Sequence, residues 1–296
     1  MKTLNYQLHI ENYRRYLRLL NYAESTVYND PKKIKYFLEY LENRQITEIE
    51  EIKNRHIQNY VKELRTRPNM RKNGALSKNY IQNNVNALKR FSKYLQKTQY
   101  KNLNINIKSG KIETEKITLT KAEISALYKA TNYPADNEIN TILNIRDRAM
   151  LGIYYGCGLR RNEGIQLDTE DILTEKSLIF VRKAKGNRQR YVPVSKKVMQ
   201  DLKNYMFTAR NYLTNNINEK AFFLSSAGKR LTGQSMIMRL KKLLQKADIK
   251  KDAGLHTLRH SIATHFLKSG MKIENLSDFL GHASLESTQI YTHLCD

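Results

Sequence analysis

Apolar and aromatic residues in the first hundred positions recur three and four residues apart, the spacing that places them on one face of an α-helix. The pattern predicts a small, basic, all-helical lobe built from four helices. The helices are expected over residues 6–20, residues 25–41, a stretch that ends near residue 64, and residues 78–95.

Capping and helix-breaking residues mark where these helices begin. Pro31 must start, kink or break the second helix, because proline lacks an amide N–H and crowds the preceding turn. Asp30 is then placed to cap a restart of that helix. Thr47 with Glu50 has the spacing of a capping box ahead of the third helix, and Ser77 is placed to cap the fourth.

The pattern changes after residue 101. Over residues 102–116 the periodicity gives way to Asn, Lys, Ser and Gly, which is typical of a linker. Beyond the linker, helical stretches surround a β-hairpin at residues 177–194 with a basic tip. We predict a mainly α chain with a small β-hairpin or sheet in its C-terminal domain. The predicted divisions are an N-terminal domain (1–101), a linker (102–116) and a C-terminal domain (117–296). Helices of the C-terminal domain are predicted after a Thr120–Glu123 capping box and at residues 146–155, 198–212, 236–247, 256–267 and 285–293.

The chain carries far more positive charge than solubility requires. Its 52 Lys and Arg against 28 Asp and Glu give a formal net charge of +24. The excess is +13 over residues 1–110 and +11 over residues 111–296, so both predicted domains are basic. A polyanion, DNA or RNA, is the expected partner. For composition alone, the alternative is a basic protein from a lysine-rich proteome.

Cysteine usage and hydropathy narrow the compartment. Cys157 and Cys295 are the two cysteines, and their spacing predicts neither a disulfide framework nor a zinc site. No apolar stretch has the length of a signal peptide or a membrane span. We therefore expect a cytoplasmic protein with no membrane partner.

Two pairs of polar residues in the C-terminal domain have helical spacing. Arg160 and Glu163 lie three apart, as do His256 and Arg259, so each pair is expected on one face of a helix. Taken singly, each pair has an ordinary explanation: an intrahelical ion pair for the first and a solvated helix face for the second.

Lys185 and Tyr291 are no more informative when each is taken alone. Lys185 at the hairpin tip would ordinarily be a solvent-exposed turn lysine. Tyr291 is one of 19 tyrosines, and a tyrosine is by default a packing residue with a polar tip. His282 is expected in a turn before a short helix that carries Tyr291 and that Ser284 is placed to cap. The order of these residues along the chain changes this interpretation.

Five motifs follow one another along the C-terminal domain: Gly158-Leu-Arg-Arg-Asn-Glu163, the hairpin Lys185, His256-Thr-Leu-Arg-His260, Leu280-Gly-His282 and Tyr291-Thr-His293. In this order they resemble the tyrosine recombinase (phage integrase) family, most closely its Xer-like and mobile-element members. The resemblance implies a two-domain DNA clamp, in which a helical core-binding domain precedes a tyrosine recombinase catalytic domain. Weaker matches to the family's N-terminal lobe are Ala23-Glu-Ser-Thr-Val-Tyr28 and Leu76-Ser-Lys-Asn-Tyr80.

The resemblance implies site-specific DNA recombination or integration, with Tyr291 as the nucleophile and a 3′-phosphotyrosine intermediate. Arg160 and Arg259 suit the neutralisation of the two non-bridging phosphate oxygens, because guanidinium groups bind such oxygens in bidentate fashion. They would replace the metal ions of other phosphoryl-transfer enzymes, so neither a cofactor nor ATP is expected. His256 is the candidate base and Lys185 the candidate acid for the leaving 5′-oxygen.

The remaining residues of the expected site bind or orient. His282 would hydrogen-bond the phosphate, and Glu163 would orient the arginine and the His256 region without reacting itself. Candidate DNA-binding residues are Lys78, Lys89, Arg90 and Lys93 on the fourth helix and Arg188 and Arg190 in the hairpin. The expected partners are a double-stranded recombination site, a homo-tetramer on two synapsed sites with a monomer when free, and an accessory or heteromeric recombinase.

Two positions have neighbours that compete for the same role. Arg161 directly follows Arg160, but the Gly-Leu-Arg frame favours Arg160. Lys183 competes with Lys185, which the following Gly-Asn turn favours.

The sequence ends five residues beyond Tyr291, where relatives typically carry a further helix that docks on a neighbouring protomer. We therefore expect another surface, or the tyrosine-bearing helix itself, to supply that contact.

Three other functions are weighed against recombination. A type IB topoisomerase-like nicking-closing enzyme would use the same chemistry as a monomer with little sequence preference. A catalytically inactive DNA-binding accessory protein would keep the fold, but Tyr291, Arg160 and Arg259 are all present. The interpretation as an RNA-binding protein would rest on charge alone, since no aromatic RNA-recognition motif occurs in the sequence.

Overall fold

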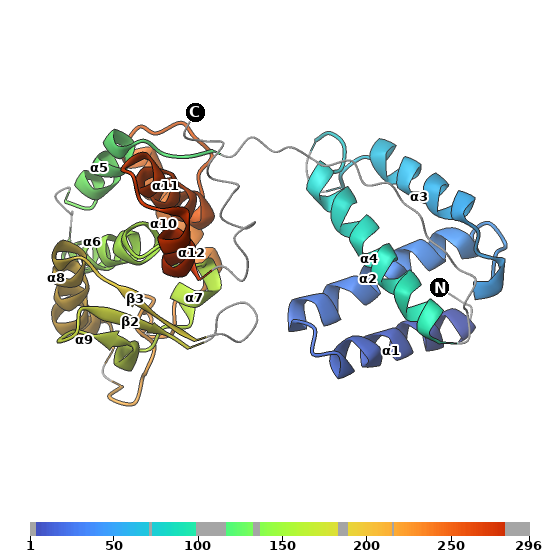
Figure 1. Cartoon of the computed structure of the whole chain (residues 1–296), viewed down its shortest axis with the longest axis horizontal. Helices are drawn as coiled ribbons and strands as arrows, with labels where there is room; N and C mark the ends of the chain where they lie inside the picture. Colours follow the sequence, from blue (N-terminus) through green and yellow to red (C-terminus); the bar gives the residue numbers. More distant parts are fainter. Residues whose placement is uncertain are drawn as a thin grey trace. The chain divides into compact units, whose positions relative to one another are not determined.

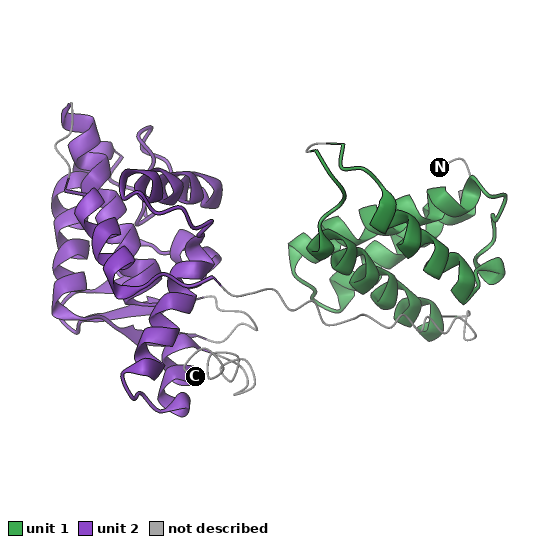
Figure 2. Ribbon diagram, turned by 90° about the horizontal axis from the view of Figure 1, so that it is seen from above, with its two compact units in different colours: residues 1–114 green, residues 115–296 purple. Residues whose placement is uncertain are grey.

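The computed structural model describes residues 4–70, 73–98, 117–132, 137–182, 189–214 and 216–281. The chain divides into two compact units, residues 1–114 and residues 115–296, which Figure 2 colours separately. Each unit buries a hydrophobic core of its own, so each is described by itself. No helix of the described ranges is long and apolar enough to span a bilayer.

The N-terminal unit is built from helices that pack around aromatic residues (Figure 1). The Tyr13 ring meets the Phe91 ring edge-on with centroids 5.1 Å apart, and Phe37 packs against Tyr60 at 5.2 Å. All four rings are almost fully buried, and their burial is the main source of stability in such a lobe. The helices are α1 (Leu4–Leu19), α2 (Glu24–Glu42), the short 3₁₀ helix η1 (Ile49–Glu51), α3 (Asn54–Thr66) and α4 (Lys78–Lys97).

The predicted start of α4 is confirmed, whereas Pro31 neither starts nor breaks α2. The Ser77 hydroxyl accepts a hydrogen bond from the Tyr80 amide at 3.2 Å, as a capping residue does. In contrast, α2 runs without interruption through Pro31. Asp30 caps nothing, because its buried carboxylate accepts hydrogen bonds from Arg90 at 2.6 Å and Lys33 at 3.3 Å.

The capping box predicted at Thr47 is displaced by one residue. The Glu51 carboxylate, not that of Glu50, accepts hydrogen bonds from the amides of Thr47 at 3.1 Å and Glu48 at 3.3 Å. These bonds close the short 3₁₀ turn, and α3 begins only at Asn54. The helix is therefore where the pattern predicts it, but its entry is a separate turn.

The C-terminal unit packs helices around a three-stranded antiparallel sheet of strand order β1-β2-β3 (Figure 1). The hairpin strands are confirmed as β2 (Leu178–Val181) and β3 (Arg190–Pro193), with Val181 opposite Arg190 at the end next to the turn. The short β1 (Ile172–Leu173), which was not predicted, pairs with β2.

Helices of this unit follow the predicted pattern with two additions, α7 and α12. The Thr120–Glu123 capping box is confirmed, with bonds of 2.7 and 3.1 Å. The helix predicted at residues 285–293 lies outside the described residues. The helices are α5 (Lys121–Ala130), α6 (Glu138–Leu151), α7 (Arg161–Ile165), α8 (Lys196–Asn204), α9 (Arg210–Leu213), α10 (Gly233–Lys246), α11 (Leu255–Lys268) and α12 (Ile273–Leu280). Further turns are the 3₁₀ helix η3 (Thr169–Asp171) and the π-helical turns Gly152–Gly156 and Tyr205–Ala209.

Candidate active site

The segment that carries Arg160 is shaped by the turn that precedes it. The π-helical turn Gly152–Gly156 ends α6, and Gly158 adopts a φ of +60°, which favours glycine. A Cβ atom on Gly158 would lie 3.1 Å from side-chain atoms of Phe279 and Leu280. The glycine therefore lets the start of α7 approach the end of α12.

Glu163 is a buried carboxylate that two arginines share. Its Oε1 accepts hydrogen bonds from Arg160 Nη1 at 2.8 Å and Arg190 Nη1 at 3.1 Å, and its Oε2 accepts from Arg190 Nη2 and the Arg160 amide, both at 2.9 Å. Burial raises the pKa of this carboxyl, but the hydrogen bonds and charges of Arg190 and Arg160 outweigh burial and hold the pKa at about 2. Glu163 is therefore ionised at neutral pH.

The guanidinium groups of Arg160 and Arg259 converge on the last carbonyls of α12. Arg160 Nη2 donates to the Gly281 carbonyl at 3.0 Å, and Arg259 Nη2 donates to the Leu280 carbonyl at 2.7 Å. Arg259 Nη1 also donates to the Gly158 carbonyl. Arg259 is buried, whereas 23% of the Arg160 side chain is exposed, so Arg160 remains accessible to a ligand.

His256 lies on α11 beside these arginines and is exposed to solvent. Partial desolvation and the positive charges of Arg259, Arg161 and Arg160 lower the pKa of its imidazole, and Glu163 opposes that shift. The imidazole is therefore biased toward its neutral form, which is the form that accepts a proton.

The structure brings together four of the predicted site residues: Arg160, Glu163, His256 and Arg259. Between the two competing arginines, Arg160 and not Arg161 donates to Glu163 and Gly281. The other predicted residues of the site, Lys185, His282, Tyr291 and Arg188, lie outside the described residues, as does Lys183. Within the described ranges, no group of three or more His, Cys, Asp or Glu side chains is placed to hold a metal ion.

The candidate DNA-binding residues on α4 differ in their surroundings. Lys78 and Lys93 are exposed and Lys89 is half-buried. Arg90 is tied to the N-terminal core by its 2.6 Å bond to Asp30, so part of its charge is compensated within the protein. Arg90 therefore differs from the exposed Lys78 and Lys93 on the same helix.

Arg190 was expected to contact DNA, but the structure places it inside the site. Only 12% of its side chain is exposed, and its guanidinium is bound to Glu163. Strand alternation is the signal that could have shown this, because Arg190 is two residues from the buried Val192 and so faces the same side of β3. Gly281, whose importance was also not predicted, packs against Arg190 at the end of α12.

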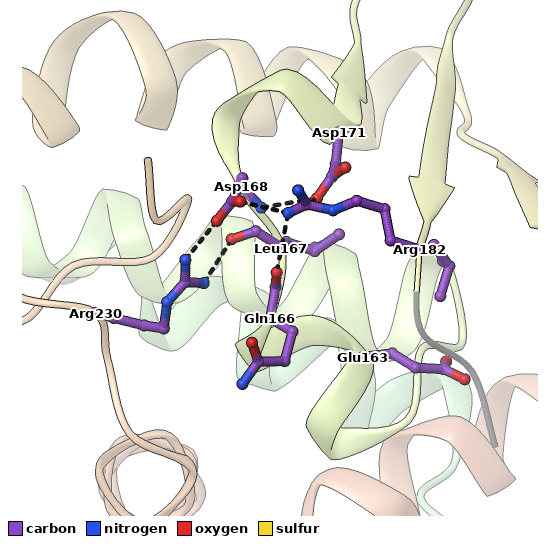
Figure 3. Close-up of a pocket in the computed structure, with 8 residues that line it drawn as sticks. Glu163, Gln166, Leu167, Asp168, Asp171, Arg182 and Arg230 are labelled. Atoms are coloured by element: carbon purple, nitrogen blue, oxygen red, sulfur yellow. Dashed lines mark hydrogen bonds and ion pairs between the residues drawn. The ribbon is translucent and has the colours of Figure 1, made fainter. Parts of the chain in front are cut away.

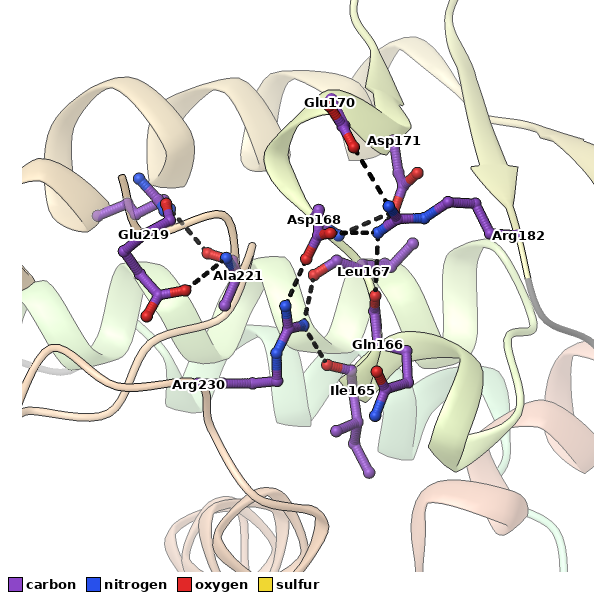
Figure 4. Close-up of polar contacts among 11 residues, drawn as sticks. Ile165, Gln166, Leu167, Asp168, Glu170, Asp171, Arg182, Glu219, Ala221 and Arg230 are labelled. Carbon is purple, nitrogen blue, oxygen red and sulfur yellow. Dashed lines mark hydrogen bonds and ion pairs between the residues drawn. The ribbon is translucent and has the colours of Figure 1, made fainter. Parts of the chain in front are cut away.

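A second charged cluster, centred on Asp168, lies beyond Glu163 and anchors the end of β2 (Figure 4). Asp168 accepts from both Arg182 and Arg230, and Arg182 also contacts Asp171 at 2.9 Å. Arg230 donates in addition to the carbonyls of Ile165 at 2.9 Å and Leu167 at 3.0 Å. The cluster thereby fixes the segment after α7 to the strand that leads into the hairpin turn.

The Asp168 cluster borders a cavity of about 230 Å³ (Figure 3). The two arginines on its wall, Arg182 and Arg230, are already bound to Asp168. Arg182 also pairs with Asp171 and Glu170, so three carboxylates surround two guanidinium groups and leave little attraction for an anionic ligand. We assign this cavity a structural role, and the arginines around Glu163 are the better candidates for a phosphate.

Known proteins are similar to this chain in sequence. Residues 118–296 match the phage integrase family, and residues 10–102 match the phage integrase N-terminal SAM-like domain. A tyrosine recombinase XerD of Staphylococcus epidermidis is 30% identical over 289 residues, which cover 96% of this chain and 93% of that protein. A tyrosine recombinase XerC of Oceanobacillus iheyensis is 29% identical over 294 residues, with coverage of 97% and 92%.

Solved structures agree on the fold. The XerH site-specific recombinase bound to a palindromic difH substrate has a TM-score of 0.75 at 20% identity, covering 99% of this chain and 94% of that one. A lambda integrase dimer bound to a core site has a TM-score of 0.65 at 14% identity, covering 95% and 96%. From the family matches and the full-length relatives, the chain belongs to the phage integrase family and is a site-specific tyrosine recombinase of the Xer and integrase type.

Proposed function

We propose that this recombinase cleaves and rejoins double-stranded DNA at a specific site through a 3′-phosphotyrosine on Tyr291. The observation that carries the proposal is the convergence of Arg160 and Arg259 on the carbonyls of Gly281 and Leu280. These carbonyls end the helix directly before His282, so the arginines bind the start of the segment that carries His282 and Tyr291. DNA is the substrate in the XerH and lambda integrase complexes of the same fold.

The reaction follows from the chemistry of the groups. The Tyr291 oxygen attacks the phosphorus while the 5′-oxygen of the next nucleotide leaves, so one phosphodiester bond is exchanged for another and no nucleotide cofactor is consumed. Arg160 and Arg259 neutralise the charge that develops on the two non-bridging oxygens, the task that metal ions perform in other enzymes of this class of reaction. His282 donates a hydrogen bond to the same phosphate.

Two proton transfers complete the step. His256, biased toward its neutral form by desolvation and the nearby arginines, takes the proton of the tyrosine hydroxyl. Lys185 gives a proton to the leaving 5′-oxygen. Rejoining is the reverse reaction, and exchange follows when the attacking 5′-hydroxyl comes from a partner duplex. We propose that this occurs in the cytoplasm within a homo-tetramer on two synapsed sites, formed from monomers and open to an accessory or heteromeric recombinase.

A covalent-capture experiment tests the chemistry. Native protein is incubated in EDTA, without ATP, with a library of nicked duplexes of randomised sequence, and DNA that remains bound after denaturation is recovered and sequenced. We expect a shared sequence from native protein and none from Tyr291→Phe. Tyr212→Phe, which alters an exposed tyrosine of the same unit, is the matched control and should capture the same duplexes. Capture that survives in Tyr291→Phe, or tight binding with no capture by native protein, would contradict the proposal.

A further inference from the structure

Arg190 contacts both groups that hold the Arg160 side chain. Among the described residues, that side chain donates to two acceptors, Glu163 and the Gly281 carbonyl. We infer that Arg190 is a positioning residue that fixes Arg160 and keeps its positive charge available to the DNA phosphate. The inference rests on the proposed function and adds to it the control of charge around Arg160.

The contact with Glu163 is bidentate. Nη1 and Nη2 of Arg190 bind the two oxygens of the Glu163 carboxylate at 3.1 and 2.9 Å. Paired bonds of this kind fix the plane of the carboxylate as well as its place. The carboxylate plane in turn sets the direction of the 2.8 Å bond from Arg160 Nη1.

The contact with Gly281 is a close approach that only glycine permits. Gly281 ends α12 with a φ of +63°, and a Cβ built on it would lie 2.7 Å from Cδ and Nε of Arg190 and 2.9 Å from Cζ. The Arg190 side chain therefore supports the residue whose carbonyl accepts from Arg160. Arg190 reaches both acceptors from β3, a different element from either.

The charges give Arg190 a second effect. Glu163 paired with Arg160 alone would form a neutral pair, and the attraction of Arg160 for a phosphate would be largely cancelled. With Arg190 present, two guanidinium groups share one carboxylate, so one positive charge remains in excess beside the exposed edge of Arg160. Arg190 itself is mostly buried, so its charge acts through the cluster rather than by contact with DNA.

This charge argument makes a prediction that a purely structural role does not make. Arg190→Gln removes the excess charge, and we expect the single-turnover rate of covalent capture to fall by roughly a hundredfold, the usual scale for loss of an electrostatic contribution at a reacting phosphate. Glu163→Gln added to Arg190→Gln removes the carboxylate that would then neutralise Arg160. The double variant should therefore react about tenfold faster than Arg190→Gln alone.

The chain offers a matched control in Arg239. Arg239 also donates two nitrogens to a buried carboxylate that a second arginine shares, binding Asp147 at 2.7 and 2.6 Å, but it lies on α10 outside the site. Arg239→Gln should lower thermal stability and leave the rate of the folded protein within about threefold of native. Arg190→Lys keeps the positive charge but loses the paired N–H donors of the guanidinium group. Its rate of covalent capture should lie between those of native protein and Arg190→Gln.

The probe for all variants is the nicked duplex that native protein selects from the randomised library, used at a temperature where each variant is folded. A second duplex carries a methylphosphonate at the cleaved position, which removes the negative charge that Arg160 would meet. We expect the defect of Arg190→Gln to shrink on this neutral duplex. The inference is overturned if Arg190→Gln reacts within threefold of native, if the double variant is slower than Arg190→Gln, or if the defect is the same on both duplexes. Failure of the proposed function would look different, because native protein itself would then capture no duplex.

Discussion

Asp147 and Glu163 are buried carboxylates of the C-terminal unit that are each shared by two arginines, yet their surroundings differ. Asp147 is bound by Arg146 at 3.1 Å and by Arg239, and the second donor of Arg146 is used by the Leu224 carbonyl at 2.9 Å. Glu163 is bound by Arg160 and Arg190. The same arrangement therefore occurs between α6 and α10 and at the site, as it also does at Asp168.

The difference lies in what stands beside each carboxylate. Near Glu163, Arg259 adds a further buried guanidinium, and the outer donors of Arg160 and Arg259 hold consecutive carbonyls at the end of α12. Near Asp147, Arg146 donates instead to the carbonyl of the buried Leu224. An arginine–carboxylate cluster is thus structural where its remaining donors meet the core. It becomes a candidate for catalysis where a third guanidinium, that of Arg259, stands beside it and the donors hold the residues directly before His282, as at Glu163.

The largest effect is expected when the Glu163 cluster loses Arg160. Arg160→Ala should lower the single-turnover rate of covalent capture about a thousandfold, because a fixed charge at a non-bridging oxygen is lost. Binding of the selected duplex, measured by titration, should change far less, since the net charge of +24 leaves many other cations to attract the DNA backbone. A capture rate within tenfold of the native rate would show that Arg160 does not take part in the reaction.

The opposite pattern is expected for the Asp147 cluster. Asp147→Asn leaves the guanidinium groups of Arg146 and Arg239 without their shared charge, and breaking such a buried pair costs about 3 kcal/mol. Denaturant unfolding should show this loss, while the capture rate of the folded variant stays near native. If the rate instead falls as steeply as in Arg160→Ala, the two clusters are not functionally distinct.

The stability of the Glu163 cluster should depend on pH in the acid range. Its pKa is held at about 2 in the folded protein against an ordinary value of 4.5, so its ion pairs stabilise the fold above pH 4.5 and are lost as the pH falls toward 2. The shift corresponds to a stability change on the order of 3 kcal/mol. Unfolding measured between pH 5 and pH 2 should therefore be less pH-dependent in Glu163→Gln than in native protein. Equal slopes for both proteins would contradict the assignment.

The smallest effect on the capture rate is expected from substitutions of two glycines. Gly270 and Gly281 both lie at helix ends and both have a positive φ. Gly270 has a φ of +88° and no atom within 4 Å of an added Cβ, whereas a Cβ on Gly281 would overlap Arg190. Gly270→Ala should cost about 1 kcal/mol of stability from backbone strain and leave the rate unchanged. Gly281→Ala should cost at least as much and also slow capture about tenfold, because the support of Arg160 shifts. Identical rates for the two variants would show that the Arg190 contact is not used.

Much of the fold could be predicted from apolar spacing and caps. The caps at Ser77 and Thr120 and the strands of the hairpin follow from local sequence alone. Local sequence could not decide the effect of Pro31: α2 is continuous across the proline, where the neighbouring Asp30 carboxylate binds Arg90 of α4. Tertiary contacts here outweigh a local preference.

The sequence predicts which residues form the site better than it predicts the hydrogen bonds between them. Arg160, Glu163, His256 and Arg259 could be selected from ordered motifs. The bonds from these arginines to the carbonyls at the end of α12 could not be predicted. They depend on the turn at Gly158 and on a helix of eight residues, whose apolar pattern at Ile273, Leu276 and Leu280 is too short to recognise. The alternation of β3 places Arg190 against Glu163, which its charge alone does not indicate.

The most direct test of the central claim is to locate the DNA on the protein. Native protein trapped on its selected nicked duplex in EDTA is digested, and the peptide that carries nucleotide is sequenced by mass spectrometry. The account predicts a 3′-linked nucleotide on Tyr291 and on none of the other tyrosines among the 19. A nucleotide on any other residue, or a covalent complex that forms only when a divalent metal is restored, would contradict it.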